Sequence, residues 1–133
     1  MYGTFLNLTQ HPASEDQARD GLIDLTGEVR ASLLGALTFT SLPTGDVIAE
    51  AAAKIVAIAK ALNADYAMIG GAGFLLPELE RQLLAECIFP LQAFTARVVE
   101  ETISPTGEMV KTSVFRHAGW IRTPGVLAAT ADY

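Results

Sequence analysis

The chain has 133 residues, which is the size of one domain with one hydrophobic core. Half of the residues are hydrophobic and 18% are charged, which excludes an intrinsically disordered chain. The formal net charge of −6 argues against nonspecific nucleic-acid binding, because such binding requires clustered lysine and arginine to replace phosphate counterions.

Cysteine content and hydropathy indicate the compartment. Cys87 is the single cysteine, so the chain forms no internal disulfide and has no C-x-x-C pair for zinc or redox chemistry. We interpret Cys87 as a small core residue at the end of a helix. The N-terminus lacks the features of a signal peptide, and no apolar stretch reaches the ~20 residues that a membrane span needs. We therefore expect a cytoplasmic protein that does not contact a membrane.

The N-terminal half is predicted to alternate short strands and helices. Residues 5–9 have the apolar pattern of a buried strand, and Ser14 with Gln17 has the spacing of a capping box, so a short helix begins at Ser14 and ends near Gly21. A short strand at 22–25 and a helix at 28–37 follow. The longest helix begins after Ser41 or Thr44 as N-cap, and its apolar stripe runs from residue 48 to residue 62.

The C-terminal half is predicted to contain a βαβ unit and a hairpin. A strand at 66–69 leads into Gly70-Gly71-Ala72-Gly73 and then into a helix with Pro77 in its first turn and an apolar stripe of Leu76, Leu79, Leu83 and Cys87. The extended segments 91–103 and 109–121 are joined by Ser104-Pro105-Thr106-Gly107, which has the residues of a type I turn.

These elements predict one α/β domain over residues 1–124. Its fold is a three-layer sandwich with helices on both faces of a mostly parallel, Rossmann-like sheet, and with an antiparallel β-hairpin at the C-terminal end. The tail at 125–133 has no clear pattern and is either frayed or packed on a partner.

Ligands of open α/β sheets bind beyond the carboxyl ends of the parallel strands. The candidate binding residues therefore lie near the ends of the predicted strands or along the fourth one: Asn7, Thr9, Gly70, Gly71, Gly73, Thr95 and Arg97. The glycine loop brings backbone N–H groups and a helix N-terminus towards an anion, although a tight turn would need the same glycines. The loop is not a P-loop, and we predict no cofactor and no metal site.

Two histidines are candidates for chemistry. His11 is the candidate catalytic residue, because it lies among polar side chains at a strand end and could act as a general base or donate to a phosphate. Alternatively, a histidine before Pro12 closes a turn. His117 has no metal-ligand spacing to another histidine or cysteine, and a surface or interface role is expected for it.

The run Leu6-Asn7-Leu8-Thr9-Gln10-His11-Pro12, followed by Ser14 and Gln17, resembles the start of small CRISPR-associated proteins with a compact Rossmann-like fold. Such proteins are similar to stand-alone CARF domains, which as a class bind cyclic oligoadenylates, and some of which cleave them. The resemblance implies that Asn7, Thr9 and His11 lie near a ligand. An anionic ligand would also need local positive charge, from Arg97, Arg116 or Lys111.

Two functions are therefore expected from the sequence. The first is binding or processing of a small anionic or nucleotide ligand of the cyclic-oligoadenylate kind at the strand ends, with catalysis left open. The alternative is a noncatalytic, self-assembling interaction or regulatory protein. In both cases we expect a homo-oligomer, because the strand from Met109 to Arg116 carries only two charges and would leave an open edge.

Overall fold

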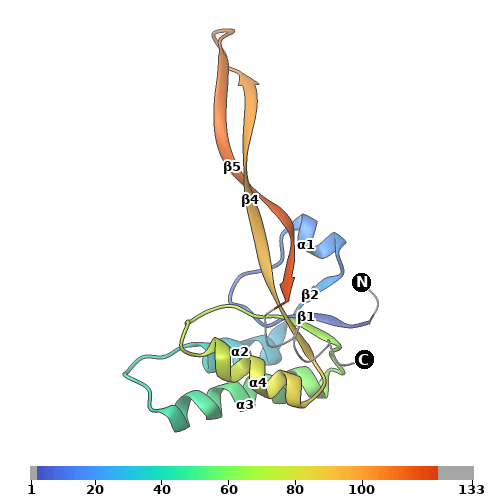
Figure 1. The fold of residues 1–133 in the computed structure, drawn as a ribbon, viewed down its shortest axis with the longest axis vertical. Helices are drawn as coiled ribbons and strands as arrows, with labels where there is room; N and C mark the ends of the chain where they lie inside the picture. The colour runs from blue at the N-terminus through green and yellow to red at the C-terminus, as the bar shows by residue number, and fades with distance from the viewer. Residues whose placement is uncertain (1–2, 123–133) are drawn as a thin grey trace.

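The computed structural model describes residues 3–122, which form an α/β body with a long hairpin rising from it (Figure 1). The strands and helices follow in chain order: β1 (Phe5–Asn7), α1 (Glu15–Arg19), β2 (Leu22–Asp24), α2 (Gly27–Leu37), α3 (Gly45–Ala61), β3 (Tyr66–Met68), α4 (Leu76–Ala85), β4 (Phe89–Ile103) and β5 (Met109–Arg122). The predicted order of elements is confirmed.

The five strands form one mixed sheet in the order β2-β1-β3-β4-β5. The first four strands are parallel, and β5 is antiparallel to β4. The predicted, mostly parallel sheet with a C-terminal antiparallel hairpin is therefore confirmed. The connections from β1 and β3 leave in opposite directions along the sheet, which makes the β1/β3 boundary a topological switch point.

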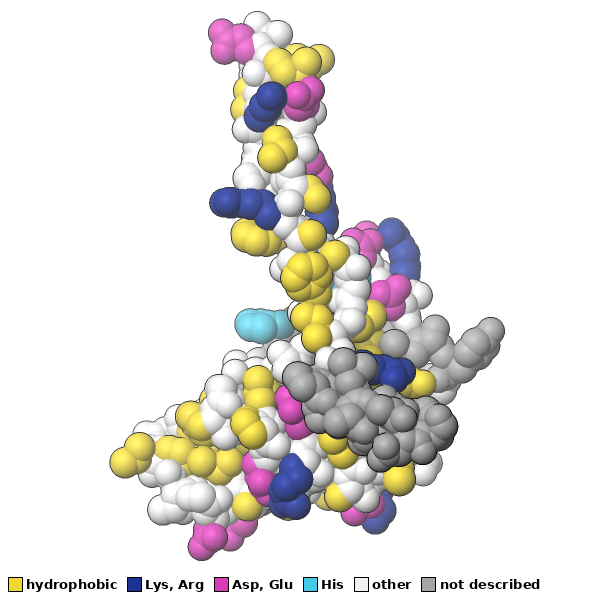
Figure 2. Space-filling model, in the orientation of Figure 1, with side chains coloured by type: hydrophobic (Ala, Val, Ile, Leu, Met, Phe, Trp, Pro, Cys, Tyr) yellow, Lys and Arg dark blue, Asp and Glu magenta, His cyan; other side chains and the backbone are white. Residues whose placement is uncertain are grey.

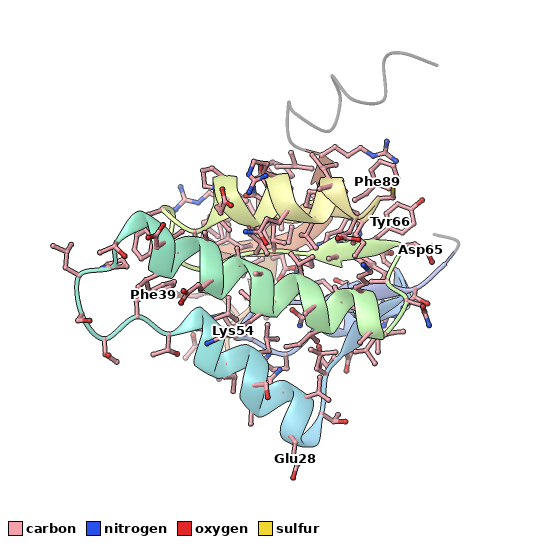
Figure 3. The ribbon with its side chains drawn as sticks, turned by 90° about the horizontal axis from the view of Figure 1, so that it is seen from below. Glu28, Phe39, Lys54, Asp65, Tyr66 and Phe89 are labelled. Atoms are coloured by element: carbon pink, nitrogen blue, oxygen red, sulfur yellow. The ribbon has the colours of Figure 1, made fainter. Side chains whose placement is uncertain are left out.

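The main core lies between one face of the sheet and helices α2, α3 and α4, which run side by side across that face (Figure 3). On α3, Ala52, Ile55 and Ala59 are fully buried, as the predicted stripe requires. On α4, Leu79 and Leu83 are buried beneath the same layer. Burial of one such leucine or isoleucine contributes about 1.5–3 kcal/mol, so this face supplies most of the stability.

The other face of the sheet has a smaller core. Phe5, Met68 and Leu91 are buried there and contact Trp120, whose ring centroid lies 4.8 Å from that of Phe5. Helix α1 follows β1 but contributes no buried residue. The third layer of the predicted sandwich therefore stays a prediction.

Local signals fixed the helix ends, with one correction. Ser14 forms the capping box with Gln17, and of the two candidate caps for α3 it is Thr44 whose side chain accepts from the Val47 N–H. The interpretation of Cys87 as a core residue is wrong, because Cys87 is exposed and has a φ of 58°. Helix α4 ends at Ala85, and the left-handed turn at Cys87 directs Ile88 into the core instead.

The hairpin extends far beyond the body (Figure 1). We call residues 95–117 the arm; it starts at the bulge between Phe94 and Thr95, and none of its residues is buried. The turn at its tip is as expected, with the Gly107 N–H donating to the Ser104 carbonyl at 2.9 Å and a φ of 86° at Gly107. The arm is therefore a two-stranded ribbon without a core.

Candidate functional site

A pocket of about 320 Å³ lies at the switch point, beyond the carboxyl ends of β1 and β3. Such a volume is at the lower end of the range for small-molecule sites. We call it the strand-end pocket, and its lining residues come from the loop after β1, helix α1, the loop after β3, and β4: Thr9, Gln10, His11, Pro12, Gln17, Met68, Ile69, Gly70, Gly71, Gln92 and Ala93.

The loop after β1 is held by the buried side chain of Asn7. The Asn7 amide donates from Nδ2 to the His11 carbonyl and to Asp24 Oδ1, both at 2.8 Å. The amide oxygen accepts from the Thr9 N–H at 3.0 Å and from Thr9 Oγ1 at 2.6 Å. All four hydrogen-bonding positions of the amide are used. Asn7 therefore positions the loop and does not itself face the pocket.

Two more contacts fasten the same loop. The Asp24 carboxylate, at the end of β2, accepts from the Ala13 N–H at 3.0 Å. The Arg30 guanidinium, on α2, donates to the Gln10 carbonyl at 2.9 Å. The loop between β1 and α1 is thus tied to three elements, and hydrogen bonds to charged groups are stronger than neutral ones.

His11 has a held backbone and an exposed side chain. Its carbonyl accepts from Asn7 and lies 3.3 Å from Thr9 Oγ1, whose proton is donated to Asn7 at the shorter distance. The imidazole lines the pocket and makes no hydrogen bond with another described residue. Among the described lining residues, His11 is the only one with an acidic or basic side chain. Acid–base chemistry in the pocket would therefore depend on His11.

The glycine loop contributes backbone to the pocket at two of the three predicted positions. A Cβ on Gly70 would lie 3.2 Å from Thr9 Cγ2, so the loops after β1 and β3 approach closely there. Gly71 has a φ of 111°, which L-residues with a Cβ rarely adopt. Gly73 differs, since it does not line the pocket and a Cβ there would meet open space. A side chain is therefore disfavoured at Gly70 by the close contact and at Gly71 by the backbone angle. Neither reason applies at Gly73.

The structure separates Thr95 and Arg97 from this pocket. β4 does not end at the edge of the body, and it carries both residues onto the arm. The Arg97 guanidinium lies 5.9 Å from the centre of the Phe115 ring. No lysine or arginine is among the described residues that line the pocket, so an anion there would be met by backbone N–H groups and polar side chains.

A second hollow of about 400 Å³ adjoins the first and shares Gln10 and Gly71 with it. Its walls include the rings of Phe39 and Phe74, which pack edge to face with centroids 4.9 Å apart. Figure 3 shows Phe39 at the end of the helical layer away from Tyr66 and Phe89. No local sequence pattern indicates this hollow, because its two aromatic residues lie on loops far apart in the chain.

A polar contact at the base of the arm was also missed. Asp20 Oδ2, just after α1, lies 2.9 Å from His117 Nε2 and accepts a hydrogen bond from Trp120 Nε1 at 2.9 Å. The bond with His117, followed by that with Trp120, lowers the pKa of Asp20. The contact joins the residue after α1 to the base of the arm at His117 and to Trp120 just below it. His117, for which a surface or interface role was expected, thus makes a contact within the chain.

Residues 3–121 match the model of the family described as the Uncharacterized protein MJ1673 family, so the chain belongs to that family. No curated protein and no solved structure matches it. Within residues 3–122, no helix is long and apolar enough to cross a membrane, and no group of three or more potential metal-ligating side chains occurs.

Proposed function

For this member of the MJ1673 family, we propose that the strand-end pocket binds a small anionic ligand of the nucleotide class. The support is its place at the switch point of a sheet with the order 2-1-3-4, where doubly wound proteins bind nucleotides and flavins. The lining offers the backbone of Gly70 and Gly71 and the polar side chains of Thr9, His11 and Gln92. Such groups suit phosphate and ribose oxygens.

The observation that carries this proposal is the hydrogen-bond network of Asn7. A fully buried amide with four satisfied bonds fixes the loop that presents Thr9 and His11, so the loop is ordered before any ligand arrives. Such ordering favours binding, because less conformational entropy is lost when the ligand is held.

The adjoining hollow suits the nucleobase of such a ligand. A nucleotide combines a charged, polar part with a flat, apolar one, and Phe39 and Phe74 offer aromatic edges next to the strand-end pocket. The N-terminal resemblance to CRISPR-associated proteins related to CARF domains adds the cyclic oligoadenylates as the ligand class. Where the ligand is also cleaved, His11 is the proposed general acid or base.

The proposal includes a cytoplasmic homo-oligomer. A noncatalytic interaction or regulatory protein is the second candidate, and a specific observation favours it: the arm carries large apolar side chains that are exposed, among them Val99, Ile103, Met109 and Phe115. In that case self-assembly through the arm would be the function, and the strand-end pocket would stay empty.

The two candidates are separated by calorimetric titration with mononucleotides, dinucleotides and cyclic oligoadenylates. We expect the parent to bind at least one of them and His11→Ala to bind much more weakly. The stability of His11→Ala should stay within about 0.5 kcal/mol, as for an ordinary exposed residue. Arg19→Ala, an exposed change on α1 outside the pocket, is the matched control and should bind as the parent does. Absence of binding by the parent to any of these ligands would contradict the proposal.

A further inference from the structure

The arm has more exposed apolar surface than a free ribbon in water can stabilise. Val99 is 65% exposed, Ile103 73% and Phe115 69%, and hydrophobic side chains occur along the whole length of the arm (Figure 2). An isolated two-stranded hairpin is marginally stable in water, because neither of its faces is covered. Large exposed apolar patches mark interaction surfaces. The exposed apolar side chains therefore indicate that the arm is an interaction surface.

One edge of the arm is open over a defined length. β3 pairs with β4 only from Phe89 to Leu91. From Gln92 to Ile103, the backbone groups on this edge of β4 have no neighbouring strand within residues 3–122. An open edge offers free N–H and C=O groups to another strand. The open segment leads from the rim of the strand-end pocket to the tip of the arm.

We propose that this edge pairs with the same edge of a second copy of the chain, antiparallel and around a two-fold axis at Val99. In this register Arg97 lies opposite Glu101 of the partner subunit, and by symmetry Glu101 lies opposite Arg97 of the partner subunit. Opposite charges at facing positions stabilise a pair of strands, and one self-complementary patch on both copies is what a two-fold dimer requires.

The charged residues of β4 favour this register over registers with the axis at a nearby residue. A two-fold axis perpendicular to the sheet places one residue opposite its own copy. An axis at Arg97, Glu100 or Glu101 would therefore place like charges opposite each other, which destabilises strand pairing. An axis at Val98 would place Arg97 opposite the Val99 position and give no ion pair. Only the axis at Val99 gives two ion pairs without a like-charge contact.

Both charged groups are available for the contact. Arg97 forms no ion pair with any described residue and only lies over the Phe115 ring. Glu101 has a long contact of 3.9 Å with Lys111, and both side chains are more than half exposed. By contrast, Glu100 is engaged by Arg116 across the hairpin.

The outer edge of β5 offers no comparable match. Pairing of β5 with its copy around Thr112 or Ser113 would place Lys111 opposite the Ser113 or Phe115 position, so Lys111 gains no ion pair. The axis at Thr112 would bring Glu108 opposite Arg116, but Arg116 is already engaged by Glu100 across the hairpin. The edge expected from the sequence to self-associate, Met109–Arg116, is thus less complementary to itself than the edge of β4.

The register also places the partner's tip at the strand-end pocket. With the axis at Val99, Ile103 lies opposite Thr95 of the partner subunit, and the Ser104–Gly107 turn continues past the position of Ala93 and Gln92. Those two residues line the strand-end pocket. The tip of each arm would therefore add a wall to the pocket of the other copy. The pairing itself does not rest on the proposed ligand; only this consequence uses the pocket.

Single cysteines test the pairing directly. Val99→Cys places a thiol on the proposed axis next to its own copy, within the distance that a disulfide can bridge. Ser113→Cys is the matched control, because Ser113 is the cross-strand neighbour of Val99 at the same height on the other edge of the arm. Each of the two variants also carries Cys87→Ala, which removes the exposed native thiol.

After mild oxidation we expect the Val99→Cys chain to run mainly as a covalent dimer on a nonreducing gel and the Ser113→Cys chain mainly as a monomer. Cross-linking of Ser113→Cys alone would overturn the proposal in favour of the β5 edge. Absence of cross-linking in both variants would overturn it outright.

A charge exchange tests the register. By light scattering coupled to size exclusion, the parent should have twice the 14.1 kDa mass of one chain. Arg97→Glu or Glu101→Arg alone should shift the mass towards one chain, and the double variant should restore the dimer, because unlike charges again face each other. Circular dichroism checks that each variant is folded. A folded double variant that stays monomeric would contradict the register.

Ligand titration of the same variants keeps the two proposals distinct. A dimer that binds no nucleotide would leave the pairing intact and contradict the proposed function alone. A monomeric parent that binds a nucleotide would contradict the pairing and leave the proposed function intact.

Discussion

The strand-end pocket and the arm use the same sheet in opposite ways. Around the pocket, short strands of three residues end together, and a buried amide, a carboxylate and a guanidinium fix the loop that follows them. In the arm, two strands continue far beyond their neighbours and bury nothing. The body therefore has an ordered site, whereas the arm leaves large apolar side chains exposed.

The largest loss of stability is expected for substitution of Asn7, at the centre of the ordered loop. Asn7→Leu keeps the size of the side chain but removes all four hydrogen bonds, leaving the Thr9 N–H and the Asp24 carboxylate without this partner. We expect the free energy of unfolding to fall by about 2–4 kcal/mol in urea denaturation. Thr9→Val removes only the hydroxyl and should cost about 1 kcal/mol. Equal effects of the two changes would show that the network does not centre on Asn7.

Substitution in the glycine loop should cause the next largest loss of stability. Gly71→Val forces a β-branched residue into a φ of 111°, so we expect a loss of about 1–3 kcal/mol. Gly73→Val is the matched control two residues away, where a Cβ meets open space, and its effect should stay within about 0.5 kcal/mol. Thermal and urea unfolding of both variants measure the difference. Similar losses at the two positions would contradict the special conformation of Gly71.

The stability provided by the contact of Asp20 with His117 and Trp120 should depend on pH. The bonds from His117 and Trp120 lower the pKa of Asp20 below its ordinary value of 3.8. A lowered carboxyl pKa gives stability that is present above the ordinary value and is lost as the pH falls through the lowered one. Between about pH 5 and about pH 3, the parent should therefore lose more stability than Asp20→Asn, by less than about 1 kcal/mol because the group is partly exposed. An identical pH profile for both proteins would exclude this contribution.

Removing the arm should have the smallest effect on stability. Replacing residues 97–115 by Asn-Gly joins the cross-strand neighbours Ala96 and Arg116 in a tight turn. Because the deleted residues bury no side chain in the body, the free energy of unfolding should change by no more than about 1 kcal/mol. Arg97→Glu, which is expected to be monomeric, is the reference in urea denaturation. A loss well above that value would mean that the arm supports the body.

Local sequence signals predicted most of the elements, because they act over a few residues. The capping box of Ser14, the stripe of α3 and the Ser104–Gly107 turn each depend on neighbours in the chain, and each is present in the structure. The same local reasoning placed Cys87 in the core, and it missed the left-handed turn that exposes it.

The sequence by itself determined the α/β class, the parallel βαβ unit, the hairpin and the loops that could form a site. Only the tertiary structure decided which of the candidate residues meet: His11, Thr9, Gly70 and Gly71 share a pocket, Asn7 lies buried beneath it, and Thr95 and Arg97 stand on the arm. Periodicity predicts that a strand exists and which face it buries, but it does not fix where its neighbours stop. Because β3 ends its pairing at Leu91 while β4 continues to Ile103, the same strand borders the pocket at its base and leaves an open edge above it.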